Sequence, residues 1–274
     1  MTSPEAIRRE LDAAFDVSAA DIEFFRKNGF VRIKQVFSSG LLEHSRAAIS
    51  RCVQRLNKQS LPMEQRSLYD RAFLQVTNLW TQDQTVREFV LGRRLGGIAA
   101  ALLGVSGVRL YHDQALYKEP GGGITPWHAD QYYWPLTSDR TVTAWIPLQA
   151  TPLEMGPVAF CPGSQTLTLG RDLEIGEESE KTLQAALASA GLDEKPFDSG
   201  EVSFHTGWTF HRAGKNQTPL PREVMTMIYM DENMRLAKPG NKNQILDAEV
   251  FCPGVRPGEL IATHLNPVIF SGKL

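Results

Sequence analysis

The sequence predicts an α+β fold in which helices come first and a double-sheet jelly roll follows. Amphipathic helical patterns occupy about residues 1–104, and short alternating runs separated by Gly and Pro begin at Val108. Chains of this length with a β-rich core commonly form one domain. We therefore predict a single domain over residues 1–274, with a helical N-terminal elaboration over about 1–104, a jelly-roll core over about 105–235 and a C-terminal tail over 236–274.

Three helices are expected before the strands. SAADIEFFRKNG has Ser18 as its N-cap, Asp21 at the capping-box position and Gly29 as its C-terminal stop. FVRIKQV then alternates as a strand. Apolar residues at helical spacing predict a second helix over about 39–56 and a third over about 84–103.

Strands dominate the rest of the chain. The predicted strand segments are, in order, VRLYHDQALYKE, PWHADQYYW, TVTAWIPLQA, GPVAFCP, EVSFHTG, TFHRAG and EVMTMIYMD. Between them lies an acidic, helix-prone segment over about 171–196. We interpret this segment as a solvated surface helix, with an active-site cover as the alternative.

Composition limits the possible functions. The net charge of -2 gives no basic footprint for nucleic acid. No uninterrupted apolar stretch is long enough for a membrane span, and the N-terminus has no secretory pattern. The three widely separated cysteines, Cys52, Cys161 and Cys252, are typical of a reduced cytoplasm. We expect a cytoplasmic protein without nucleic-acid or membrane partners; the sequence does not predict its oligomeric state.

A candidate metal site lies in TPWHADQYYW, residues 125–134. Residues two apart in a strand point to the same face, so His128 and Asp130 can present a nitrogen and an oxygen to one point. Taken alone, the pair is a weak signal, because a lone histidine in a strand is more often a hydrogen-bonded core residue than a metal ligand. A non-haem iron site of the two-histidine, one-carboxylate type needs one more histidine, from a distant strand.

The best candidate for the third ligand is His211. It lies in TFHRAGKNQTPLPREVMTMI, where a turn and then Arg222, at the start of a strand, follow it. His44, in a predicted helix, and His264, in the tail, are expected to be structural or exposed, while His112 precedes the motif strand and His205 precedes a turn. The planar guanidinium of Arg222 suits the bidentate binding of a carboxylate beside a metal.

These motifs resemble a known family. YHDQALYKEPGGGITPWHADQYYWPL, TVTAWIPL, GPVAFCPGSQ, HRAGKNQTPLPRE and FCPGVRPGELIATHLNPVIF are similar to the phytanoyl-CoA dioxygenase family of Fe(II)- and 2-oxoglutarate-dependent oxygenases, as is the N-terminal FFRKNGFVRIKQVFS. The resemblance covers nearly the whole chain. It implies a double-stranded β-helix (jelly-roll, cupin-like) core with N-terminal and flanking helices.

The resemblance also implies roles for individual residues. His128, Asp130 and His211 would bind iron(II), and Arg222 would bind the C5 carboxylate of 2-oxoglutarate. Three further positions would belong to the cosubstrate pocket: Trp145, whose alternative role is that of a plain core residue, Gln114 and Asn78. Molecular oxygen would be the second cosubstrate.

The implied function is hydroxylation of a small organic molecule, with release of succinate and CO2. Desaturation, epoxidation or ring formation at the same site is an alternative outcome. A non-catalytic jelly-roll protein that binds a ligand in the same pocket is a third hypothesis. The family name does not identify the substrate: a CoA ester would need cations, and pairs such as Arg93 with Arg94 are more typical of solvated helix faces.

Overall fold

The computed structural model describes residues 3–272 and contains two β-sheets. The major sheet has seven strands in the order β1-β7-β5-β9-β3-β10, with β2 also paired to β3, and its pairings are antiparallel. These strands are β1 (Phe30–Ile33), β2 (Leu74–Thr77), β3 (Gly107–Lys118), β5 (Thr141–Pro147), β7 (Val202–Thr206), β9 (Arg222–Asp231) and β10 (Val268–Ser271).

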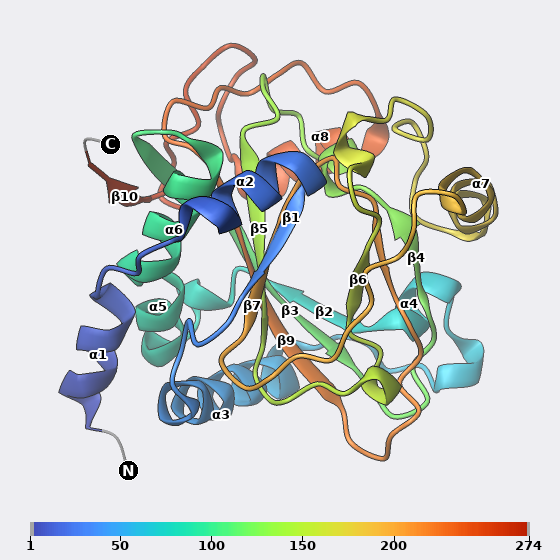
Figure 1. Cartoon of the computed structure of the whole chain (residues 1–274), viewed down its shortest axis with the longest axis horizontal. Helices are drawn as coiled ribbons and strands as arrows, with labels where there is room; N and C mark the ends of the chain where they lie inside the picture. Colours follow the sequence, from blue (N-terminus) through green and yellow to red (C-terminus); the bar gives the residue numbers. More distant parts are fainter. Residues whose placement is uncertain (1–2, 273–274) are drawn as a thin grey trace.

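The minor sheet has three strands in the order β4-β8-β6. They are β4 (Thr125–His128), β6 (Val158–Phe160) and β8 (His211–Ala213). Strands of the minor sheet alternate along the chain with strands of the major sheet, as in a jelly roll. The predicted α+β jelly-roll core with N-terminal and flanking helices is therefore what the structure has (Figure 1).

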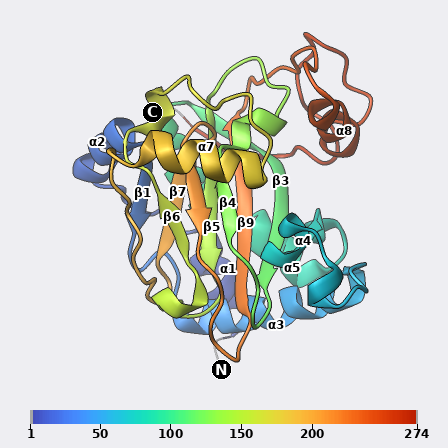
Figure 2. The same cartoon turned by 90° about the vertical axis from the view of Figure 1, so that its right-hand side faces the viewer.

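Helices cover the outer face of the major sheet (Figure 1). A continuous apolar core joins them to the strands, with Leu41, Ile49 and Ile98 from the helices and Phe204 and Met227 from the sheet all buried. The helices are α1 (Pro4–Asp12), α2 (Ala19–Asn28), α3 (Ser39–Leu56), α4 (Leu68–Ala72), α5 (Gln84–Val90), α6 (Arg93–Leu103), α7 (Glu177–Leu187) and α8 (Lys242–Phe251). Figure 2 shows α7 across the minor sheet and α8 at the edge of the fold.

The first two predicted helices are confirmed. The hydroxyl of Ser18 accepts the backbone N–H of Asp21 at 3.1 Å, and α2 ends at Gly29 with a φ of 81°. A left-handed residue that ends a helix is most often glycine. Helix α3 has the predicted bounds.

The third predicted helix is wrong, because it is two helices. Helix α5 ends at Val90 and α6 begins at Arg93, with Gly92 as an extended N-cap between them. A Cβ on Gly92 would lie 3.1 Å from the backbone oxygen of Leu11. The break therefore lets α1 pack closely against this point, a contact between distant segments that periodicity does not report.

Two further differences concern the site. Strand β4 stops at His128, and Asp130–Tyr133 form a 3-10 turn, so the predicted strand PWHADQYYW is wrong in its second half. The turn is held by Gln131, whose Oε1 accepts the hydroxyl of Thr141 at 2.8 Å. The predicted tail also contains α8 and β10, and β10 pairs with β3. The single-domain organisation stays a prediction.

Candidate metal centre

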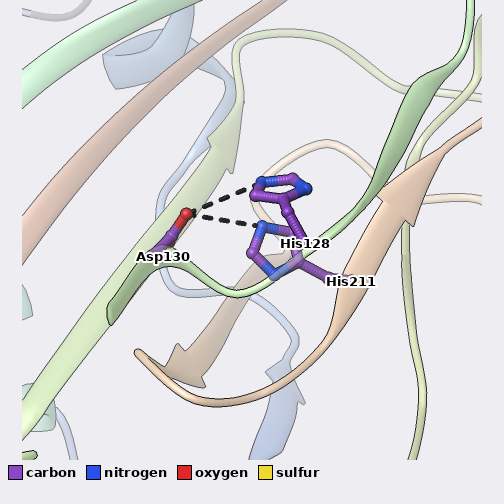
Figure 3. Close-up of side chains that lie close together, drawn as sticks. All are labelled: His128, Asp130 and His211. Atoms are coloured by element: carbon purple, nitrogen blue, oxygen red, sulfur yellow. Dashed lines mark ion pairs between the residues drawn. The ribbon is translucent and has the colours of Figure 1, made fainter. Parts of the chain in front are cut away.

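His128, Asp130 and His211 come together at one point (Figure 3). Each offers one ligand atom, and the three atoms lie within 4.8 Å of one another. Ala129 is extended, with φ -125° and ψ 130°, so His128 and Asp130 project to the same side although the strand has ended. His211 arrives from β8, in register with His128 of β4. The structure thus brings together the three residues predicted from the sequence.

Hydrogen bonds fix the orientation of both imidazole rings. His128 Nδ1 lies 2.8 Å from the carbonyl oxygen of Pro126, and His211 Nδ1 lies 3.0 Å from that of Thr209. Since a carbonyl only accepts, each Nδ1–H donates, and each Nε2 keeps its lone pair. Both Nε2 atoms lie 3.7 Å from Asp130 Oδ1. Ring orientation through the distal nitrogen is usual for metal-binding histidines.

The other oxygen of Asp130 is held by residues that sequence reasoning missed. Asp130 Oδ2 accepts the hydroxyl of Thr143 at 3.2 Å, and the Nε2 of His205 lies 3.4 Å away. Thr143 and His205 are register partners on β5 and β7, and both are buried. Thr143 lies two residues before Trp145, which was a possible signal; His205 had none beyond its residue type. The carboxylate therefore has one oxygen tied to the protein and one facing the two Nε2 atoms.

Burial sets the charge states of the cluster. Burial, with the neighbouring His211, lowers the pKa of His128 to about 4, and burial likewise lowers the pKa of His211 to about 4. Burial alone would raise the pKa of Asp130, but the adjacent imidazoles of His211, His205 and His128 hold it below its ordinary value. Neutral imidazoles and an ionised carboxylate are the forms that bind a divalent metal.

A cavity of about 670 Å³ opens onto the cluster. Arg222, Trp145 and Gln114, all predicted to contact a cosubstrate, line it together with the three cluster residues. Asn78 is not among the lining residues; it precedes a 3-10 helix in the left-handed region, with a φ of 54°. A cosubstrate role for Asn78 stays a prediction, as do the roles of the others.

Arg222 is a buried cation without a counter-ion in the described part of the chain. Only 2% of the residue is exposed, and Nη1 donates to the carbonyl oxygen of Gly156. Nε is buried with no partner among residues 3–272. The guanidinium carbon lies 5.5 Å from the centre of the Trp145 ring. An unpartnered buried donor in this cavity fits an anionic group bound beside the cluster.

The predicted surface segment takes part in the site in two ways. Glu174 and Ile175, which precede α7, line the cavity. Helix α7 packs on β4, where Glu180 accepts the backbone N–H of Trp127 at 2.9 Å and pairs with Arg212 at 3.2 Å. Of the motif's aromatic residues, Tyr133 and Trp134 line the cavity.

Other predicted features lie away from the cavity. The three cysteines are buried and free. Arg94 contacts the carbonyl oxygens of Ala13 and Val36, and Arg93 lies over the ring of Phe270. Within residues 3–272, no helix is both long and apolar enough to cross a bilayer.

A profile of the phytanoyl-CoA dioxygenase (PhyH) family matches residues 25–224. The chain belongs to the phytanoyl-CoA dioxygenase family. The class predicted from the sequence, an Fe(II)- and 2-oxoglutarate-dependent dioxygenase with these cofactors, is therefore confirmed.

Several relatives of this family member are oxygenases. It is 28% identical over 128 residues to the "Probable alpha-ketoglutarate-dependent hypophosphite dioxygenase" of Stutzerimonas stutzeri, a match that covers 44% of the chain but only 45% of that protein. It is 26% identical over 229 residues to "Dioxygenase lolE1" of Epichloe uncinata, over 78% of the chain and 82% of that protein. Among solved structures, the non-heme alpha ketoglutarate dependent carbocyclase SnoK from nogalamycin biosynthesis superimposes with a TM-score of 0.75 and 26% identity, over 92% of the chain and 96% of SnoK.

Proposed function

We propose that this dioxygenase hydroxylates a small organic molecule, with His128, Asp130 and His211 as the iron ligands and Arg222 as the anchor of 2-oxoglutarate. One observation carries the proposal. Three ligand atoms converge within 4.8 Å in a cavity that also contains a fully buried arginine with no carboxylate partner in the described residues. Core packing alone would not require that combination.

Arg222 and Trp145 have different roles in this proposal: the first positions the cosubstrate and the second excludes water. Bound iron and 2-oxoglutarate supply oxidation by O2, with succinate and CO2 as by-products. Arg222 holds the far carboxylate of the cosubstrate by charge and by the planar fork of its guanidinium. Trp145 packs beside that guanidinium and keeps water from it, which strengthens the ion pair.

The substrate occupies the outer part of the cavity. The cavity wall includes the rings of Tyr69, Phe73, Tyr133 and Phe251 and the side chain of Val250 from α8. Polar side chains, among them Asp70, Gln75 and Asn243, also line the cavity. Apolar walls combined with polar groups that fix orientation are typical of sites for small organic ligands. A volume of about 670 Å³ accommodates both the cosubstrate and a compact substrate.

Two alternatives keep the same cavity. Desaturation, epoxidation or ring formation depends on where the substrate presents its C–H bonds, and the likeness to a carbocyclase makes ring formation a specific alternative. A non-catalytic ligand-binding role is disfavoured because all four residues of the site are present and face one cavity.

The test compares His128→Ala with His44→Ala, a control on an exposed histidine of α3. Conversion of 2-oxoglutarate to succinate is measured with Fe(II) and O2 in the absence of substrate, where such enzymes retain slow uncoupled turnover. We expect the wild type and His44→Ala to produce succinate and His128→Ala to lose at least about 100-fold of this rate, because a ligand is removed. Equal rates in all three proteins would contradict the assignment, and no succinate from folded wild type would favour the binding-protein alternative.

A further inference from the structure

Helix α8 forms one wall of the cavity at the edge of the fold (Figure 2). Its residues Asn243, Leu246, Asp247, Val250 and Phe251 line the cavity. Relative to the first of them, the others follow after three, four, seven and eight positions, which places all five on one face of the helix. Only Phe251 is buried. This face therefore meets the cavity more than it meets the apolar core.

Asp247 places an unpaired carboxylate on this face. Its Oδ1 accepts the hydroxyl of Tyr111, a residue of β3 that is fully buried. Within residues 3–272, Oδ2 has no hydrogen-bond partner, and no lysine, arginine or histidine forms an ion pair with the carboxylate. One oxygen is thus fixed by the protein, and the other is free to bind a ligand in the cavity.

The described part of the cavity has no spare cation for Asp247. Its lining includes two arginines, Arg212 and Arg222, and no lysine. Arg212 pairs with Glu180 of α7 at 3.2 Å, and Arg222 is the proposed anchor of 2-oxoglutarate. Lys242, at the start of α8, pairs at 3.5 Å with a glutamate of the loop before α7. A positive charge that neutralises Asp247 must therefore come from a ligand.

Two further polar side chains of the cavity lack partners. His112 is 4% exposed, and its ring stacks on Phe251 with the ring centres 3.9 Å apart. Its Nδ1 and the Nδ2 of Asn243 are buried without a hydrogen-bond partner among residues 3–272. Burial lowers the pKa of His112 to about 4, so its imidazole is neutral and does not neutralise Asp247. Unsatisfied buried polar groups beside a cavity indicate a ligand with hydrogen-bonding groups.

The same face of α8 also offers an apolar surface. Leu246 and Val250 line the cavity, yet they are 60% and 40% exposed. Burial of such side chains is favourable, so a ligand with a hydrocarbon part gains affinity by covering them. The helix therefore presents one charged group and an apolar patch to the same ligand.

From this geometry we propose that the substrate is a compact organic cation, whose ammonium group binds Asp247 and whose hydrocarbon part packs on Leu246 and Val250. The bond from Tyr111 fixes the carboxylate, so that Oδ2 faces the ammonium group. Asp247 is thus a specificity-determining residue, which selects amines over neutral molecules of the same shape. The inference rests on the proposed function and names the substrate class of that same site.

The simpler explanation is that Asp247 is a protonated structural residue, which ties α8 to β3 through Tyr111. Burial raises the pKa of Asp247 to about 8, so an unpaired carboxylate is costly here. A bound ammonium group favours the ionised form and recovers part of that cost. The two explanations differ in what the cavity selects, because a neutral structural carboxyl group has no preference for a cation.

The experiment compares two probes that share a phenylethyl group: phenethylamine, which is a cation, and 2-phenylethanol, which is neutral. Mn(II)-loaded protein with saturating 2-oxoglutarate is kept free of O2 at about pH 8.5, where an alkylamine stays protonated. Bound Mn(II) accelerates the NMR relaxation of ligand protons in the same cavity, so a titration reports both the location and the dissociation constant. Zn(II)-loaded protein is the diamagnetic reference.

We expect the wild type to bind phenethylamine at least about tenfold more tightly than 2-phenylethanol, the effect of one hydrogen bond between charged groups. Asp247→Asn keeps an acceptor for Tyr111 but removes the charge, and it should bring the two dissociation constants within about twofold of each other. Glu249→Gln is the matched control, because it removes an exposed acid of α8 that does not line the cavity. This control should keep the wild-type preference.

Each outcome decides the proposal. Equal affinities of the wild type for both probes, or a preference that Asp247→Asn leaves unchanged, would overturn it in favour of the structural explanation. If Asp247→Asn fails to fold, the comparison of the two probes on the wild type and on Glu249→Gln decides alone. If neither probe is relaxed although Mn(II) and 2-oxoglutarate bind, the proposal is overturned while the proposed function stands. If the wild type fails to bind Mn(II) or 2-oxoglutarate, the proposed function fails, and the inference fails with it.

Discussion

Replacing Arg222 with methionine is predicted to leave the ligand-free protein at least as stable as the wild type. Burial lowers the pKa of Arg222 to about 9 from an ordinary 12.5, and at about 1.4 kcal/mol per pH unit this corresponds to a cost of about 5 kcal/mol for the buried charge. The hydrogen bond to Gly156 offsets about 1.5–3 kcal/mol of that cost. The variant should therefore gain about 2–3.5 kcal/mol in its free energy of unfolding.

The same change should remove most of the affinity for 2-oxoglutarate. Loss of one partner of a buried ion pair costs about 3–5 kcal/mol, which is a fall of about 100-fold to several thousand-fold in affinity. Urea unfolding of the metal-free protein measures the stability, and calorimetry with Mn(II) and 2-oxoglutarate measures the binding. A gain in the free energy of unfolding together with a loss of affinity for 2-oxoglutarate would indicate that Arg222 serves ligand binding and not folding.

Arg32→Met is the matched control for stability. Arg32 is a mostly buried arginine of β1, but it has carboxylate partners, Glu201 at 3.1 Å and Asp193 at 3.8 Å. Its removal leaves the carboxylate of Glu201 without its cation, while Asp193 keeps its ion pair with Lys195. The loss should destabilise the protein by about 3–5 kcal/mol. If Arg222→Met destabilised the ligand-free protein as much as Arg32→Met does, the interpretation of Arg222 as an unpaired cation that is neutralised only by a bound ligand would be refuted.

Three further changes test other parts of the structure. Thr143→Val removes a donor to Asp130 Oδ2 and should weaken Mn(II) binding about 10- to 100-fold; calorimetry that showed an unchanged affinity would argue against this role. Burial lowers the pKa of His112 to about 4, so below about pH 6.5 the unfolded chain takes up a proton that the folded protein does not. His112→Phe should therefore reduce the loss of stability between pH 6.5 and 4 by up to about 3 kcal/mol. Parallel stability profiles of the variant and the wild type against pH would contradict this prediction. Glu180→Ala should cost about 1–3 kcal/mol in urea unfolding, since it leaves the backbone N–H of Trp127 without its acceptor; an unchanged midpoint would mean that α7 is not fixed to β4 by this contact.

Local rules of sequence predicted much of the fold. The caps at Ser18 and Gly29 define α2 because a hydroxyl acceptor and a left-handed glycine satisfy free backbone groups at the helix ends. The strand order in the sheets and the break at Gly92 depend on contacts between distant segments. Helix α8 was missed for a related reason: its only buried residue is Phe251, so it shows no apolar face in the sequence.

The sequence likewise predicted only part of the candidate site. The spacing of His128 and Asp130 predicts a shared direction, and the structure places His211 and Arg222 in the same cavity. Their roles in binding stay predictions. The hydrogen bonds of Thr143 and His205 to Asp130 require the register of β5 against β7, and the hydrogen bond from Tyr111 to Asp247 requires α8 to lie beside β3. Neither relation is encoded in a local pattern.

The most direct test of the central claim is the anaerobic addition of Fe(II) and then 2-oxoglutarate to metal-free protein, followed by visible absorption. The wild type is predicted to develop the weak charge-transfer band of iron bound by a 2-oxo acid, and Asp130→Ala should lack it. A well-folded wild-type protein that shows no band, although Fe(II) and 2-oxoglutarate are both in excess, would contradict the assignment of this cavity as an iron and 2-oxoglutarate site.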